Sequence, residues 1–254
     1  MTSRWLILIT AVFMGVAALA SAQTAIDEFE RGNMLYRDGK FDQAASSYES
    51  ILRQGLASAP LYFNLGNSYY RMGRLAPAIL AYERALRLQP NDPDISHNLN
   101  LLTYKTVDRI EPLPELFFVQ WLRSISVLIP LHTTTWLFSS CWFALFGGFA
   151  LLYLFNAAPV LRFLRGLIIL SGIALLPLAL LLATQAADSQ NRTDAIVMAS
   201  VVTAKTSPDN QSVDAFVVHE GLKVRLGDSV GEWMKIILPD GKVGWIRSGD
   251  CERI

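Results

Sequence analysis

Residues 59–92 read APLYFNLGNSYYRMGRLAPAILAYERALRLQPND, and the 34 residues before them, 25–58, follow the same pattern. A shift of 34 places aligns glycine, asparagine and tyrosine pairs of the two copies, among them Gly32 with Gly66, Asn33 with Asn67, and Tyr48 with Tyr82. This period is typical of two-helix repeats, in which small residues let neighbouring helices approach closely. The pattern predicts an all-α helical repeat domain over 23–110.

The second copy resembles the tetratricopeptide consensus at the positions Leu65-Gly66, Tyr69, Ala78, Tyr82, Ala85 and Pro90. Pro90 is expected to end the second helix because proline cannot donate the next backbone hydrogen bond. A third first-helix pattern at 93–107 predicts a capping helix that turns Leu99, Leu101 or Leu102 onto the second repeat. Stacked repeats of this kind form a concave surface that binds proteins or peptides.

The resemblance implies that the first helix of each repeat lines this groove. The residues at the groove positions are Phe29, Asn33, Tyr36, Arg37, Phe63, Asn64, Asn67, Tyr70 and Arg71. Asparagine amides both donate to and accept from an extended peptide backbone. Repeats that bind a C-terminal carboxylate carry lysine where this chain has Phe29 and Phe63, so an apolar pocket is expected instead. The alternative is that the asparagines cap local turns and the tyrosines belong to the core.

The first 22 residues predict an export signal. Arg4 precedes an apolar run that ends near Leu19, and Ala20-Ser21-Ala22 follows as a cleavage pattern before Gln23. If cleavage fails, the segment becomes a membrane anchor. In both cases we expect residue 23 onward to leave the cytoplasm.

Two apolar runs, 131–156 and 160–184, are each long enough to cross a hydrocarbon layer of ~30 Å. They predict a hairpin of two transmembrane helices. Arg162 and Arg165 lie in the short connection with no acidic residue nearby, and such a bias places a loop in the cytoplasm. Both flanking regions would then face the periplasm of a bacterial inner membrane.

Residues 111–130 form an amphipathic pattern rich in aromatic residues when drawn as a helix. This segment either lies in the lipid headgroup layer or packs on the repeat domain. Residues 185–194 are expected to be a polar linker.

From residue 195 to 254, short valine- and isoleucine-rich runs alternate with turn residues, which predicts an all-β domain. Asp240-Gly241 is typical of a hairpin turn with positive φ. The stretches Gly231-Glu232-Trp233-Met234 and Asp240-Gly241-Lys242-Val243-Gly244-Trp245 resemble the bacterial SH3 family and imply an SH3-like barrel. Trp233 and Trp245 are its candidate surface residues, with packing at the core or rim as the alternative.

Composition excludes several classes of function. The formal net charge is zero and 52% of the residues are hydrophobic, so no basic surplus is present to hold a nucleic acid. Cys141 lies in the first span and Cys251 in the β region, and this separation predicts neither a disulfide framework nor a metal site. His97, His132 and His219 have no nucleophile or carboxylate at helical or strand spacing. We therefore expect a protein without catalytic activity and without a cofactor.

The order of these segments predicts a multidomain membrane protein, which resembles the BatE-type proteins of the bacterial aerotolerance operon. The resemblance implies an adaptor in an envelope stress complex, with von Willebrand factor A-domain membrane proteins and a MoxR-type ATPase as partners. Two alternatives stay open from the residues. The β domain could bind peptidoglycan peptides of the cell wall, or the protein could be a receptor that passes a periplasmic signal to a membrane partner.

Overall fold

The computed structural model describes residues 23–111, 113, 121, 124–126, 128–154, 157–190 and 193–254. The chain forms two compact units. One combines the residues up to Pro112 with Asp194–Ile254, and the other is Leu113–Thr193. The predicted export signal 1–22 lies outside the described residues, as does most of the amphipathic segment 111–130.

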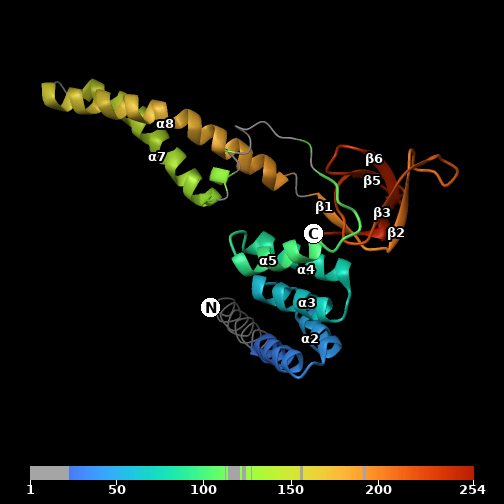
Figure 1. Ribbon diagram of the computed structural model, residues 1–254. Helices are drawn as coiled ribbons and strands as arrows, with labels where there is room; N and C mark the ends of the chain where they lie inside the picture. The colour runs from blue at the N-terminus through green and yellow to red at the C-terminus, as the bar shows by residue number, and fades with distance from the viewer. Residues whose placement is uncertain are drawn as a thin grey trace, which may run out of the picture. The chain divides into compact units, whose positions relative to one another are not determined.

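The first unit begins with stacked antiparallel helices. A helix over residues 23–37 precedes α2 (Phe41–Arg53), α3 (Ala59–Arg71), α4 (Leu75–Leu88) and α5 (Pro93–Thr103). The labelled helices follow one another in the stack in chain order (Figure 1). Ser58 caps α3 and Asp92 caps α5 through side-chain oxygens, each with a proline in the first turn, as helix starts favour. Leu99 and Leu102 of α5 are buried against the second repeat, whereas Leu101 is exposed.

Two glycines 34 residues apart make equivalent turns between the helices of each repeat. Gly39 and Gly73 have φ values of +76° and +74°, a conformation that is strained for residues with a side chain. The residue after each glycine donates its backbone N–H to a carbonyl five residues back, Lys40 to Leu35 and Arg74 to Tyr69, at 2.9 Å in both cases. These bonds satisfy carbonyls that the helix end leaves without a partner.

Two other glycines lie where the helices of a repeat touch. A Cβ on Gly32 would come within 2.6 Å of the Tyr48 ring, and one on Gly66 within 2.8 Å of the Tyr82 ring. Both tyrosines are almost fully buried. The close contact expected at Gly66 is therefore confirmed, and it occurs in both repeats.

The second unit contains the helices α7 (Leu131–Leu154) and α8 (Ala158–Gln190), which pack against each other. Both are long and apolar enough to cross a membrane, and only 6% and 11% of their most apolar windows are buried. Helices in a soluble core would be mostly buried. The side chains of α7 and α8 therefore lack the cover that such a core provides. Gly148 lies at the contact, where a Cβ would come within 2.8 Å of Ile168, while Gly147 and Gly166 meet nothing within 4 Å.

Two details of the expected hairpin need correction. Arg162 and Arg165 lie near the start of α8 and not in a connecting loop. The predicted linker 185–194 is helical up to Gln190, because the alanine-rich sequence there favours helix. Gln185 also fixes this end of α8, since its Nε2 donates to the Ile129 carbonyl oxygen at 2.8 Å.

The C-terminal region is an antiparallel sheet, as its composition predicts. Its strands are β1 (Asp194–Val197), β2 (Val201–Lys205), β3 (Asp214–His219), β4 (Lys223–Val230), β5 (Trp233–Ile237), β6 (Val243–Arg247) and β7 (Cys251–Arg253). The strand order is β3-β2-β6-β5-β4-β1-β7. A short 3-10 turn, Ser248–Asp250, precedes β7. Gly241 has a φ of +86° in the turn between β5 and β6, which confirms the Asp240-Gly241 hairpin.

The repeats and the sheet are packed together and are not the two separate domains expected from the sequence. Ile196 of β1 is fully buried in the hydrophobic cluster formed by α4 and α5. Gly221 approaches α4 so closely that a Cβ would lie 2.9 Å from Ile79. Lys223 pairs with Glu83 at 2.8 Å, and Arg84 pairs with Glu252 at 2.9 Å. We call this contact surface the α4–sheet interface.

His219 and Asp108 add a further link between the repeats and the sheet. The backbone N–H of His219 donates to Asp108 Oδ2 at 2.6 Å, and the His219 ring Nδ1 lies 2.9 Å from Oδ1 of the same carboxylate. No local pattern predicts this pair, because 111 residues separate its members. It fastens the segment after α5 to the end of β3.

Candidate binding groove

An asparagine–tyrosine network runs along the first helices of the repeats. Asn33 Oδ1 accepts hydrogen bonds from the Tyr48 hydroxyl at 2.8 Å and from Asn64 Nδ2 at 2.9 Å. The same arrangement recurs 34 residues later, where Asn67 Oδ1 accepts from the Tyr82 hydroxyl at 2.6 Å and from Asn98 Nδ2 at 3.2 Å. The amides of Asn33 and Asn67 therefore each join three helices. These side chains do not cap local turns.

The tyrosines are fixed as hydrogen-bond donors. Burial raises the pKa of Tyr48 to about 12, and repulsion from Tyr36 adds to this effect. Burial also raises the pKa of Tyr82, opposed by a hydrogen bond with Asn98. Both phenols remain protonated at neutral pH and keep the carboxamide oxygens of the asparagines occupied.

The other half of each amide stays available. Among the described residues, Nδ2 of Asn33 and Nδ2 of Asn67 have no hydrogen-bond partner, and neither does Oδ1 of Asn64. A backbone in extended conformation presents N–H and C=O groups in alternation, which match such free donors and acceptors. The network thus holds the amides rigid and leaves one polar end of each free.

A cavity of about 300 Å³ lies at this network. It brings together five of the residues predicted for the groove and adds Tyr48, and its lining is Asn33, Tyr36, Arg37, Tyr48, Asn64 and Asn67. Arg37 is exposed, and no acidic partner for it occurs in the described part of the chain. The cavity combines apolar surface with these amides and one guanidinium that is free among the described residues, and the phenylalanines expected to shape an apolar pocket do not line it.

The remaining predicted groove residues do not line this cavity. Phe29 and Phe63 pack their rings on Tyr48 and Tyr82, each with ring centroids 5.8 Å apart, so they support the network from the side. Tyr70 accepts a hydrogen bond from Lys105 Nζ at 2.8 Å, and the Arg71 guanidinium lies over the Phe41 ring at 4.5 Å. That any of the nine residues binds a peptide stays a prediction.

Tyr48 was missed as a groove residue because it belongs to the second helix of its repeat. Tyr48 recurs as Tyr82, and each follows a repeated asparagine by the same number of residues. This recurrence could have identified Tyr48 as a groove residue. In the sheet, Trp233 and Trp245 are partly exposed on the outer face, beside Lys235 and Arg247 in the paired strands β5 and β6. Neither tryptophan belongs to the core.

Comparison with known families supports the repeat assignment. Residues 29–93 match the tetratricopeptide repeat family. This match includes α2, α3 and α4 and ends at the first residue of α5. No curated protein is found to be related to the chain. The described residues also hold no group of three or more histidine, cysteine, aspartate or glutamate side chains suited to a metal ion.

Proposed function

We propose that this protein is a non-enzymatic, membrane-anchored adaptor that holds an extended segment of a partner protein in the groove of its tetratricopeptide repeats. The observation that carries the proposal is the row of fixed amides with free ends at Asn33, Asn64 and Asn67 around one cavity. Tetratricopeptide repeats generally mediate contacts between proteins. Arg37 at the edge of the cavity favours a segment with a carboxylate or a carbonyl near it.

The anchor in this proposal is the hairpin of α7 and α8, inserted in the inner membrane with both ends of the chain in the periplasm. Two spans return the chain to its starting side, and the α4–sheet interface needs the repeats and the sheet on the same side. Arg162 and Arg165, near the turn of the hairpin, favour a cytoplasmic turn. Alkaline phosphatase fusions at residues 110, 160 and 254 test this topology. Activity at 160 with none at 254 would refute it.

The sheet is proposed to be a bacterial SH3-like domain. Its short antiparallel strands and the Asp240-Gly241 hairpin agree with that resemblance. The whole layout resembles BatE-type proteins, so we propose von Willebrand factor A-domain membrane proteins and a MoxR-type ATPase system as the complex in which the adaptor works.

The groove is tested by crosslinking in intact membranes followed by affinity purification. Arg37→Glu reverses the charge at the cavity, and Arg31→Glu on the same helix is the matched control, since Arg31 is exposed and does not line the cavity. We expect partner recovery to fall several-fold for Arg37→Glu alone. Equal recovery with both variants would move the interaction away from the groove.

A cell-wall function for the sheet is the second candidate, because Trp233 and Trp245 expose part of their rings next to basic residues on one outer face. In that case the protein should sediment with purified peptidoglycan, and Trp245→Ala should release it. A protein that stays in the detergent supernatant excludes this function.

A further inference from the structure

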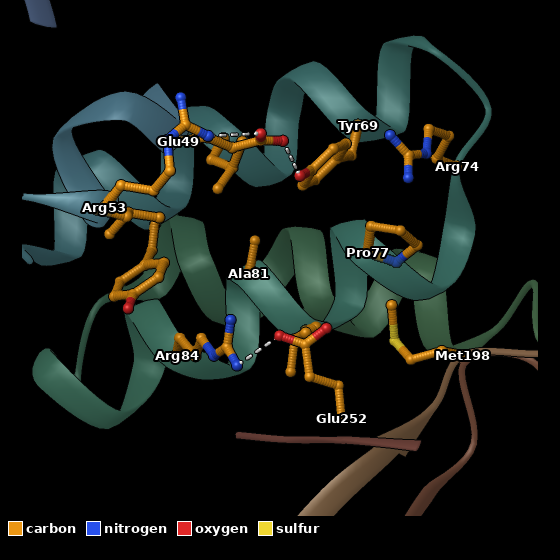
Figure 2. A pocket seen from close by; sticks show the side chains of 13 residues that line it. Glu49, Arg53, Tyr69, Arg74, Pro77, Ala81, Arg84, Met198 and Glu252 are labelled. Atoms are coloured by element: carbon orange, nitrogen blue, oxygen red, sulfur yellow. Dashed lines mark hydrogen bonds and ion pairs between the residues drawn. The ribbon is translucent and has the colours of Figure 1, made fainter. Parts of the chain in front are cut away.

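A second cavity, of about 410 Å³, lies between α2 and α4 and is walled partly by the sheet. Tyr62, Leu65 and Tyr69 of α3 also line it, whereas Met198 and Glu252 come from the C-terminal region. It shares no lining residue with the cavity at the asparagine network. Figure 2 shows Glu49, Tyr69 and Arg74 along one side, and Arg84, Glu252 and Met198 along the other.

One wall of this cavity is a chain of fixed polar contacts. The Tyr69 hydroxyl donates to Glu49 Oε1 at 2.5 Å, and Arg53 lies 3.5 Å from the same carboxylate (Figure 2). The Arg74 guanidinium lies over the Tyr69 ring, 4.9 Å from its centre. Burial raises the pKa of Tyr69, and the bond to Glu49 raises it further, so the phenol remains a donor. Glu49 is therefore already occupied on both oxygens.

On the opposite wall, the carboxylate of Glu252 also has an arginine partner. Arg84 donates to Glu252 at 2.9 Å and to the Arg253 carbonyl oxygen at 2.6 Å. Between these walls the lining is apolar and comprises Leu52, Leu65, Pro77, Leu80, Ala81 and Met198. An occupant therefore meets apolar surface inside and arginines at the rim.

The charge of the cavity is not balanced. Three arginines, at positions 53, 74 and 84, line it with the two glutamates, at 49 and 252. Arg74 is the arginine without an acidic partner among the described residues, and the first turn of α4 beside it contains no acid. A free, exposed guanidinium that lies over an aromatic ring is well placed to bind a carboxylate in two-point geometry.

We infer that this cavity is a second peptide site, which takes an acidic segment with a carboxylate at Arg74 and a neighbouring apolar side chain over Leu80 and Met198. The site is composite, because one wall exists only while the sheet is packed on α4. It shares no residue with the asparagine groove, so a substitution can abolish peptide binding at one site and leave the other intact. Charge complementarity selects an acidic peptide over a basic one.

The test uses the full-length protein in a nonionic detergent and a fluorescein-labelled peptide of alternating leucine and aspartate, with fluorescence anisotropy as the readout. We expect saturable binding whose affinity falls as the salt concentration rises. Arg74→Ala should lower the affinity about fivefold, because it removes one exposed charge contact. Arg74→Lys should bind the peptide more tightly than Arg74→Ala but more weakly than the wild type. The control is Arg31→Ala, which also removes an exposed arginine but lines neither cavity.

A second measurement locates the peptide. The same peptide with a benzophenone group should crosslink to Met198, on the sheet wall of the cavity, and Arg37→Glu should not change this. Equal binding by a leucine–lysine peptide, an unchanged affinity for Arg74→Ala, or crosslinks confined to the residues around Asn64 would each overturn the inference.

Discussion

Replacing Gly66 with alanine tests the close helix contact on which the repeat stack depends. The added methyl group would lie 2.8 Å from two carbon atoms of the Tyr82 ring and 3.2 Å from a third. The ring has no room to move, because Tyr82 is fully buried and its hydroxyl is bonded to Asn67. Forcing a methyl group into such a contact costs ~1–3 kcal/mol.

Helix propensity alone predicts the opposite sign, since alanine stabilises a helix interior by ~1 kcal/mol relative to glycine. We expect the clash to dominate and the free energy of unfolding to fall by ~1–2 kcal/mol. A urea titration of the full-length protein, read by pulse proteolysis, measures this as a lower midpoint with an unchanged slope. Gly147→Ala is a useful reference, because a Cβ there meets nothing within 4 Å.

A double-mutant cycle with Tyr82→Leu identifies the cause. If the ring is the obstacle, Gly66→Ala should cost much less in the Tyr82→Leu background. An unchanged cost in both backgrounds, or a higher midpoint for Gly66→Ala alone, would refute the reasoning.

Three further predictions use the same protein. Asn33→Ala should lower the free energy of unfolding by ~1–3 kcal/mol, more than Asn64→Ala, because it leaves the buried Tyr48 hydroxyl without an acceptor; equal urea midpoints for the two variants would contradict this. Stability should fall between pH 10 and about 12, because the unfolded phenol of Tyr48 loses its proton near its ordinary pKa of 10.0 and the folded one only near 12; Tyr48→Phe should reduce the slope of stability against pH in this range. Ile196→Asp should separate the sheet from the repeats and speed hydrogen exchange in α4, and protection equal to the wild type would show that Ile196 does not hold the interface.

The helical repeats could be predicted well from the sequence because their information is local and occurs twice. The 34-residue period located the helices, and it paired Gly66 with the second helix of its own repeat. The alternation of short apolar runs and turns likewise predicted the strands. In the groove, the period identified the asparagines, but it did not show that Phe29 and Phe63 pack their rings on the tyrosines and do not line the cavity.

The packing of the sheet on the repeats could not be predicted in the same way. It joins positions such as Asp108 and His219 that no local pattern relates. One signal was present in the run Ala195-Ile196-Val197-Met198, which is apolar without alternation. A strand of that kind is buried on both faces, and here one face meets the sheet core while Ile196 meets α4.

The α4–sheet interface also sets an order of events during biosynthesis. The apolar surface of α4 around Leu75 and Ile79 is complete early, but its cover, Ile196 and Gly221, lies in the last quarter of the chain. At ~5–20 residues per second, the ribosome needs roughly 7–30 s to proceed from Asp108 to the final residue. For that time the nascent chain displays an uncovered apolar face, which is prone to aggregation. A message truncated before Asp194 would leave that face open permanently and mark the product for proteolysis.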